Sequence, residues 1–353
     1  MLMKIEKVTI SNLWGRFDIE WTINKQVSIL SGINGSGKST ILRAMASVLR
    51  GEPLPENIAH RLSRIQVMFD SGLSLSLDVR IEDFDGLQSR ARNNIDLSRT
   101  FDKLKDKFKQ EIENKTVSLV NSQRMSLNGV GHEKIDIKQF INDLKFSYIS
   151  TFDSAPARHD DPKLYMEYLI NSSYSELDRH LEIVVDRYKT YQIELSTRMS
   201  KMMSVAEPND AFGDIKNLMS KRSVLQDVLD DLMLESGKRV NRDKGDVEFI
   251  FNSDGVSHSY KDLSAGEKQL LLILLTVFMQ EGREAILIMD EPEISLHVDW
   301  QRRLLDVVMQ LNPNCQVIVS THSPAMILNG WQSAVDNISA MAKQTIEDED
   351  KPY

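Results

Sequence analysis

Residues 32–39 of this chain read Gly-Ile-Asn-Gly-Ser-Gly-Lys-Ser, which fits the pattern GxxxxGK[ST]. The apolar run Val27-Ser28-Ile29-Leu30 comes directly before this stretch, and residues 40–45, Thr-Ile-Leu-Arg-Ala-Met, follow it. A strand before the loop and a helix after it form the setting in which this pattern binds phosphate. The stretch therefore predicts a strand, a phosphate-binding loop and a helix, and with them an α/β fold.

The residue types in this loop suit the binding of phosphate for chemical reasons. Glycines at the first, fourth and sixth positions can adopt backbone angles that a β-carbon would forbid, so successive N–H groups can turn toward phosphate oxygens. The N-terminus of the following helix adds a positive charge. We expect Lys38 to reach the β- and γ-phosphates of a nucleotide and the Ser39 hydroxyl to ligate Mg²⁺. The alternative is a glycine-rich turn with a surface lysine. The candidate nucleotide-binding residues are Gly32, Asn34, Gly35, Ser36, Gly37, Lys38, Ser39 and Thr40.

The composition limits the class of protein. The chain has 353 residues, of which 27% are charged and 41% hydrophobic, as in ordinary globular proteins. A net charge of −9 argues against a bulk polyanion binder but allows a local basic face. The single Cys315 excludes a disulfide framework and a multi-cysteine zinc site. Because the first residues lack the apolar core of a signal peptide and no apolar run is long enough to span a bilayer, we expect a cytoplasmic protein without a membrane partner.

Strand and helix patterns surround the loop. Alternating apolar residues predict strands, and residues 116–120 and 125–127 are expected to form a separate β pair. Residues 99–115 have the pattern of a mixed-charge helix. From Pro162 to about Arg239, apolar residues recur at helical spacing and Glu207-Pro208 interrupts them, which predicts an inserted helical hairpin. The other predicted strands are 4–10, 17–23, 26–31, 65–69, 73–81, 146–151, 247–251 and 256–260.

A second group of motifs lies after the hairpin. The apolar run Ile286-Leu287-Ile288-Met289 ends in Asp290 and Glu291. A fully apolar strand suits a central parallel sheet that is covered on both faces. At its carboxyl end, Asp290 is placed to hold a magnesium ion and Glu291 to orient or deprotonate the attacking water. An acidic turn at the end of a strand is the alternative, which the phosphate loop makes less favourable.

Residues 263–269, Leu-Ser-Ala-Gly-Glu-Lys-Gln, precede an apolar helix and resemble the signature segment of ABC-type ATPases. In such a segment a hydroxyl, backbone N–H groups and a helix N-terminus can face a phosphate. The resemblance makes Ser264, Gly266 and Glu267 candidate nucleotide-binding residues. The structural alternative is a capping box of Ser264 and Glu267, and both can hold, because a capped helix start is also an anion site.

Further segments resemble the RecF, SMC and OLD branch of the ABC superfamily. Residues 291–297, Glu-Pro-Glu-Ile-Ser-Leu-His, resemble the loop that follows the acidic strand there, although Val298 stands where proline is frequent. His322, after the strand 318–321, resembles the switch histidine that senses the γ-phosphate. Arg16 resembles the basic residue that approaches the phosphates. The glutamine loop of the superfamily has three candidate positions: Gln123, Gln139 and residues 151–158.

The resemblance implies an ABC-type P-loop ATPase head, with a mixed central sheet, an antiparallel β subdomain and the inserted helical hairpin. We expect the N-terminal lobe in residues 1–160, the hairpin in 161–240, the C-terminal lobe in 241–340 and an acidic tail in 341–353. Catalytic roles are implied for Glu291 and His322, with Mg²⁺ held by Ser39 and Asp290. The implied substrate is ATP, hydrolysed to ADP and phosphate.

The resemblance also implies a head-to-tail dimer, or a higher assembly, that encloses two ATP molecules. Ser264 and Gly266 of one protomer would contact the γ-phosphate held by Lys38 of the other. Since the chain leaves no room for a C-terminal nuclease after His322, we expect a separate effector protein, such as a nuclease, as in the stand-alone ATPase components of bacterial anti-phage systems. A RecF-like repair ATPase that binds DNA directly is the alternative, and a membrane-transporter subunit is the least favoured. In that alternative a stripe of basic residues would serve DNA, whereas the intervening Asp102 and Asp106 favour a mixed solvated face. The basic residues are Arg90, Arg92, Arg99, Lys103, Lys105, Lys107 and Lys109.

Overall fold

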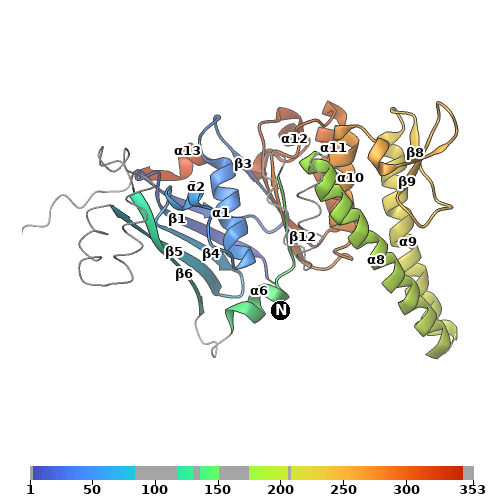
Figure 1. Cartoon of the computed structure of the whole chain (residues 1–353), viewed down its shortest axis with the longest axis horizontal. Helices are drawn as coiled ribbons and strands as arrows, with labels where there is room; N and C mark the ends of the chain where they lie inside the picture. Colours follow the sequence, from blue (N-terminus) through green and yellow to red (C-terminus); the bar gives the residue numbers. More distant parts are fainter. Residues whose placement is uncertain (1–2, 84–117, 130–135, 151–174, 206–207, 345–353) are drawn as a thin grey trace, which may run out of the picture. The chain divides into compact units, whose positions relative to one another are not determined.

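The computed structural model describes residues 3–83, 118–129, 136–150, 175–205 and 208–344 (Figure 1). The chain forms two compact units, and each consists of segments that are distant in the sequence. The first contains Met1–Lys25, Gly32–Leu144 and Asp336–Tyr353, and the second contains Gln26–Ser31 and Lys145–Val335. The predicted helix at 99–115, the basic stripe and the segment 151–158 lie outside the described residues.

The first unit is built on a six-stranded antiparallel sheet with the order β14-β2-β1-β4-β5-β6. The buried residues of β1 are Ile5, Val8, Ile10 and Leu13, and more exposed residues separate them, as expected for a sheet with one face on a core. The strands are β1 (Ile5–Leu13), β2 (Phe17–Thr22), β4 (Arg64–Phe69), β5 (Leu73–Asp83), β6 (Ser118–Gly129) and β14 (Ala342–Gln344).

Helix α1 (Lys38–Arg50) packs against β4 and β5 of this sheet (Figure 1). It begins after Gly37 and ends at Gly51, and both glycines have left-handed backbone angles. A β-carbon at Gly51 would lie 2.5 Å from Cδ1 of Ile141. Glycine therefore both ends the helix and admits a neighbouring side chain. The shorter helices of the unit are α2 (Glu56–Ala59), α6 (Ile137–Asp143) and α13 (Ile338–Met341).

The second unit contains the parallel strands β3, β12, β11 and β7 of a five-stranded sheet with the order β13-β3-β12-β11-β7, and the boundary between the units falls within β13. Every residue of β11 and β12 is buried, which matches the apolar sequence of these strands. Cys315 is the buried first residue of β12. The strands are β3 (Val27–Ser31), β7 (Phe146–Ser150), β11 (Ala285–Asp290), β12 (Cys315–Ser320) and β13 (Val335–Asn337).

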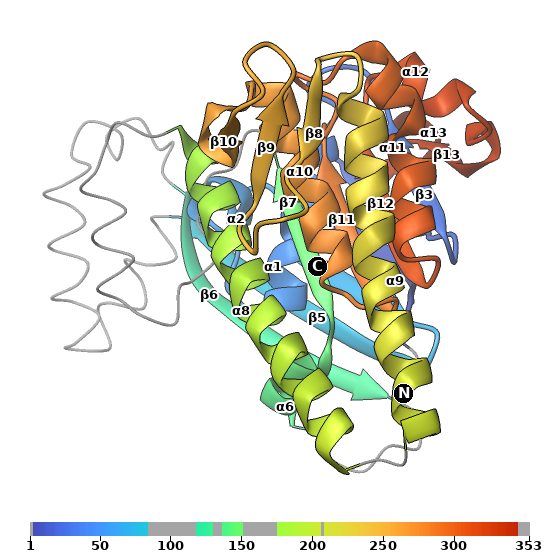
Figure 2. The same ribbon diagram turned by 90° about the vertical axis from the view of Figure 1, so that its right-hand side faces the viewer.

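Helices cover this core. The apolar α10 (Ala265–Phe278) is buried along almost its whole length and contacts two long helices, α8 (Glu176–Val205) and α9 (Pro208–Met233). In Figure 2, α8 and α9 lie on either side of α10 at one end and converge at the other. Leu181 and Val185 of α8, with Leu229 and Leu232 of α9, belong to the same apolar core as α10. The remaining elements are α11 (Val298–Leu311), α12 (Pro324–Leu328) and a small antiparallel sheet of β8 (Lys238–Val240), β9 (Glu248–Phe251) and β10 (Ser257–Ser259).

Most predicted elements are present, with one correction. The expected separate β pair at 116–120 and 125–127 is wrong, because β6 runs unbroken from Ser118 to Gly129 and pairs with β5 along its length. The two helices of the predicted hairpin are present as α8 and α9, which are separated at 206–207, and residues 161–174 of its predicted range lie outside the described residues. The predicted tail begins with β14, which pairs with β2, and residues 345–353 lie outside the described part. In the described residues no helix is both long and apolar enough to span a membrane.

Candidate functional site

The phosphate loop of the first unit has the geometry that its sequence predicts. Gly35 and Gly37 have φ angles of 79° and 99°, which favour glycine. The Lys38 side chain is buried and folds back over the loop, where Nζ donates to the carbonyl oxygen of Gly32 at 3.1 Å. Helix α1 starts without a side-chain cap, so its first N–H groups can serve a bound anion. Within the described residues, the buried Oγ of Ser36 has no hydrogen-bond partner. These features fit a bound polyphosphate.

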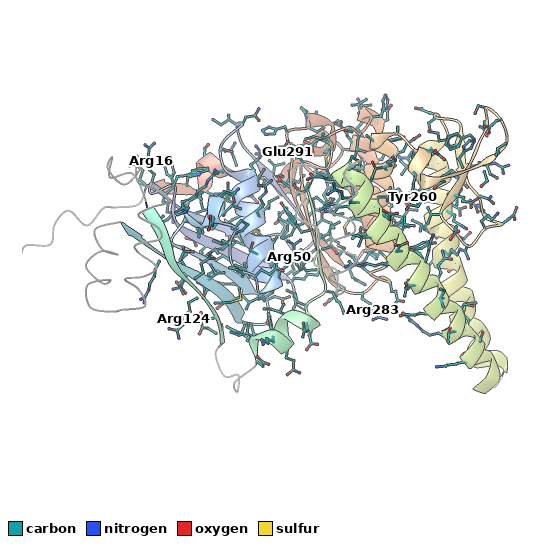
Figure 3. All side chains as sticks on the ribbon, viewed as in Figure 1. Arg16, Arg50, Arg124, Tyr260, Arg283 and Glu291 are labelled. Carbon is teal, nitrogen blue, oxygen red and sulfur yellow. The ribbon has the colours of Figure 1, made fainter. Side chains whose placement is uncertain are left out.

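The turn between β1 and β2 lies against this loop. A β-carbon on Gly37 would lie 2.2 Å from the Trp14 ring, so the indole packs directly on the backbone at the start of α1. Trp14 has a φ angle of 54°, an uncommon value for a bulky residue. The sequence reasoning missed this contact, because no local pattern links positions 14 and 37. Arg16, labelled in Figure 3, lies exposed in the same turn.

In the second unit, three parallel strands end at the same level. Leu30 of β3 is in register with Ser320 of β12, and Ser320 is in register with Asp290 of β11. The Ser320 hydroxyl donates a hydrogen bond to the buried Asp290 carboxylate. The phosphate loop follows β3, Glu291 follows β11, and His322 follows β12. Three of the predicted segments therefore start from one edge of one sheet.

Glu291 has a distinctive conformation directly after β11 (Figure 3). Its φ angle is 49°, in the left-handed region, and its backbone N–H donates to the carbonyl oxygen of Ser320 at 3.0 Å. One carboxylate oxygen lies 3.5 Å from Nε2 of His322. The structure thus brings together the two residues to which catalytic roles were assigned.

Glu293 connects the loops that carry these two residues, although the sequence reasoning gave it no role. Its Oε1 accepts hydrogen bonds from the Thr321 hydroxyl at 2.6 Å and from the backbone N–H of His322 at 2.8 Å. Thr321 Oγ1 in turn accepts from the backbone N–H of Ser323 at 2.9 Å. The available signal was a second carboxylate two positions after Glu291, but its partners lie 28 and 29 positions further on.

The signature segment starts α10 with the predicted capping box. The Ser264 hydroxyl accepts from the backbone N–H of Glu267, and the Glu267 carboxylate accepts from the backbone N–H of Ser264 at 2.8 Å. Both oxygens of this buried carboxylate also accept from Nζ of Lys238, at 2.8 and 2.7 Å. Burial alone raises the pKa of Glu267, but the bonds from Lys238 and Ser264 outweigh it, so the pKa lies below its usual value. Glu267 is held as a carboxylate, while Ser264 remains exposed.

Two more contacts fix this helix start. Nζ of Lys268 lies 2.6 Å from the carboxylate of Asp178 in the first turn of α8, and this ion pair is largely buried. A β-carbon on Gly266 would lie 2.3 Å from the carbonyl oxygen of Ser295, in the loop that follows β11. Gly266 is therefore required for the close approach of two backbones within the second unit.

The remaining candidates have structural explanations. Gln123 accepts a hydrogen bond from the backbone N–H of Leu54 at 2.6 Å and donates to its carbonyl oxygen at 2.9 Å, so its amide joins β6 to the chain beyond α1. Gln139 is exposed on α6. His297 caps α11 through its ring, and it lies with Glu235 and Asp299 in a surface group whose ligand atoms are within 4.8 Å of one another.

Comparison with known proteins identifies the family. Residues 76–328 match a family described as "AAA domain, putative AbiEii toxin, Type IV TA system", and residues 5–61 match the "P-loop containing region of AAA domain". The "Retron Vc95 probable ATPase" of Vibrio cholerae serotype O1 biovar El Tor is 22% identical over 352 residues, which cover 86% of this chain and 67% of that protein. The "Septu protein PtuA" of Bacillus thuringiensis is 26% identical over 140 residues, covering 38% of this chain and 32% of its own length.

Solved structures support the same fold. The Smc head domain of Pyrococcus furiosus, bound to the C-terminal domain of ScpA, matches with a TM-score of 0.51 and 14% identity, covering 98% of this chain and 96% of that chain. A second SmcHead structure matches with a TM-score of 0.50 and 14% identity, covering 97% of each chain. At this identity the similarity shows the fold alone. Since the first family match spans most of the chain and includes the acidic strand, the signature segment and His322, the protein belongs to this family of AAA-domain P-loop ATPases.

Proposed function

We propose that this protein hydrolyses ATP at a site that is completed by a second copy of the chain. The observation that carries the proposal is the common edge of the parallel sheet, from which the phosphate loop, Glu291 and His322 all start. Ligands of open α/β sheets bind beyond the carboxyl ends of the strands. The loop after β3 would hold the phosphates, and the loops after β11 and β12 would supply the catalytic groups.

The residue roles follow from their chemistry. Lys38 and the first N–H groups of α1 would bind the β- and γ-phosphates, within the set of loop residues from Gly32 to Thr40. Glu291 would take the proton of the attacking water or orient it. His322, whose ring lies beside that carboxylate, would contact the γ-phosphate. Arg16 would add a positive charge from the β1–β2 turn.

Mg²⁺ is the cation that the oxygen atoms of Ser39 and Asp290 would bind. The Ser39 hydroxyl and the Asp290 carboxylate are hard oxygen ligands, and Mg²⁺ is usually held by few protein oxygens together with substrate phosphates. The bound ion would neutralise phosphate charge. Ser320 donates its hydroxyl to Asp290 and so orients the carboxylate that would hold the ion.

The exposed Ser264 supports the dimeric part of the proposal. Its side chain stands at the start of a largely buried helix but is itself exposed at the surface. A helix start of this kind suits the γ-phosphate of a nucleotide held by a second copy. A self-complementary head-to-tail interface would then enclose two nucleotides. Loss of the γ-phosphate would remove these contacts, so ATP would favour the closed dimer and ADP the open one.

Control of a separate effector is the wider role that we propose. Two relatives are named for a retron and for Septu, which favours a bacterial defence system in which ATP-gated dimerisation controls a partner such as a nuclease. A repair ATPase that binds DNA directly is the second candidate, which the resemblance of residues 291–297 to the RecF, SMC and OLD branch favours. Turnover that rises on addition of duplex DNA and falls with salt would support this second candidate.

A mixing experiment tests the composite site. Lys38→Ala removes the phosphate lysine, and Ser264→Arg blocks the signature start, so each variant alone should lack turnover. A mixture contains heterodimers that join the intact loop of the Ser264→Arg chain to the intact signature segment of the Lys38→Ala chain. We expect the mixture to recover part of the wild-type turnover. If the two variants bind each other but the mixture stays inactive, the proposal of a site shared between two chains is wrong.

A further inference from the structure

Glu293 is a buried carboxylate whose hydrogen bonds are directed at the loop that carries His322. The residue is 9% exposed. Its Oε1 accepts hydrogen bonds from the Thr321 hydroxyl and from the backbone N–H of His322, so one oxygen holds two consecutive residues of that loop. The loop after β12 is thereby held by the loop after β11.

Gln301 of α11 joins the same two loops. Its amide nitrogen donates to the carbonyl oxygen of Leu296 at 2.9 Å, and its amide oxygen accepts from the Ser323 hydroxyl at 2.6 Å. Because Ser323 also donates its backbone N–H to Thr321, the side chains form one connected network with Glu293. A network of this kind fixes one arrangement of the two loops.

The burial of Glu293 is unfavourable for the free energy of folding. Among the described residues, its buried Oε2 has no hydrogen-bond partner. A buried polar atom without a partner destabilises the folded state, and a charged one does so more strongly. An expensive group that is aimed at a catalytic loop indicates a functional reason for its presence.

We propose that Glu293 is a positioning residue that holds His322 beside Glu291. This inference rests on the proposed function, in which His322 and Glu291 act together on the γ-phosphate. Their side chains are 3.5 Å apart, and the backbone of His322 is anchored by Glu293. Without this anchor the histidine ring would leave the position that catalysis needs, while the phosphate loop would still bind nucleotide.

The first test uses single variants. Glu293→Ala should lower kcat by about 10- to 100-fold, as expected for a small misplacement of a catalytic group, and change the Kd for a fluorescent ATP analogue less than about twofold. Glu293→Gln retains an acceptor oxygen and should recover part of the lost kcat. Glu194→Ala, an exposed change on α8, is the matched control and should leave kcat unchanged.

The second test is a double-mutant cycle with His322→Ala. If Glu293 acts through His322, Glu293→Ala should produce no further loss in the His322→Ala background. Equal fold losses in both backgrounds would overturn the inference, as would unchanged kcat in Glu293→Ala. If His322→Ala retains full turnover, the assigned role of His322 fails, and a wild-type protein without turnover contradicts the proposed function itself.

A further pair of variants keeps the test valid should Glu293→Ala fail to fold. Thr321→Val removes the hydroxyl that Glu293 accepts, and Thr321→Ser keeps it. We expect Thr321→Val to lower kcat and Thr321→Ser to retain most of it, with similar thermal midpoints. Equal kcat in both Thr321 variants would count against the positioning role.

Discussion

At the scale of the residue, Glu291 shows how the fold prepares a reactive group. A glutamate with a φ angle of 49° is uncommon, and such backbone conformations cost of order 1 to 3 kcal/mol. Its backbone N–H is held by the Ser320 carbonyl oxygen, which compensates part of this cost. The conformation turns the side chain toward His322 instead of continuing the strand.

Replacement of this carboxylate tests its role. Glu291→Gln should lower ATP turnover by about 100-fold or more, because an amide cannot take the proton of the attacking water. ATP binding should persist, since the phosphate loop is unchanged. Turnover assays and equilibrium binding of a fluorescent ATP analogue give the two values. Unchanged turnover would remove Glu291 from the mechanism.

The close packing at Gly266 leads to a separate prediction about the stability of the folded protein. Gly266→Ala places a β-carbon 2.3 Å from the backbone carbonyl oxygen of Ser295 and should destabilise the protein by about 1 to 3 kcal/mol. Gly245→Ala is the matched control, because no atom lies within 4 Å of its β-carbon. Urea denaturation of both variants measures the difference, and equal midpoints would show that the helix start moves away at little cost.

The sequence predicts individual motif residues well where the pattern is local. The phosphate loop, the acidic strand end and the capping box of Ser264 and Glu267 each lie within a few positions, and the structure has the expected local geometry. Trp14 and Glu293 were missed, because their partners are far away in the sequence and only the fold brings them together. The catalytic and binding roles themselves stay predictions.

At the scale of the element, ion pairs tie the start of α10 to α8 and to β8, the strand that follows α9. Asp178 of α8 pairs with Lys268, and Lys238 of β8, which follows α9, pairs with Glu267. These contacts lie directly beside Ser264. The two ion pairs therefore fix the start of α10 within the second unit.

The pair of Lys238 and Glu267 has a measurable effect on stability. Lys238→Met leaves the buried carboxylate without its cation and should destabilise the protein by on the order of 3 kcal/mol at neutral pH. Because the folded-state pKa of Glu267 lies below its usual value of about 4.3, this contribution is complete above that pH and is lost as the pH falls through the folded-state pKa.

Chemical denaturation between about pH 7 and pH 3 measures this contribution. The wild type should lose more stability on acidification than Lys238→Met. Lys343→Met removes the lysine of an exposed ion pair with Glu20 and is the matched control, expected to leave the denaturation midpoint unchanged. Parallel pH curves for Lys238→Met and the wild type would show that the pair is energetically neutral.

Elements are predictable from the sequence to different degrees. The apolar β11 and the long helices α8 and α9 follow from the sequence, because the patterns that predict them are local. The continuity of β6 cannot be predicted in this way, because the sequence suggests an interruption at 121–124. Pairing with β5 keeps the strand continuous there. The extent of β6 therefore depends on pairing across the sheet, which is a long-range interaction.

At the scale of the whole molecule, the chain crosses between its two units. β3 belongs to the second unit, and the phosphate loop that follows it belongs to the first. The family match covers residues 76–328 and so extends over parts of both units. The lobe boundaries at 160, 240 and 340 and the dimer are predictions of the sequence that await experiment.

The association state in the presence of ATP tests whether ATP closes a dimer of this chain. Sedimentation velocity of the Glu291→Gln protein, which should bind ATP without consuming it, is measured with and without Mg²⁺-ATP. We predict a shift from monomer to dimer on addition of ATP, and no shift when Ser264→Arg is added to the same chain. An unchanged sedimentation coefficient at saturating ATP, with bound nucleotide verified, would contradict the account.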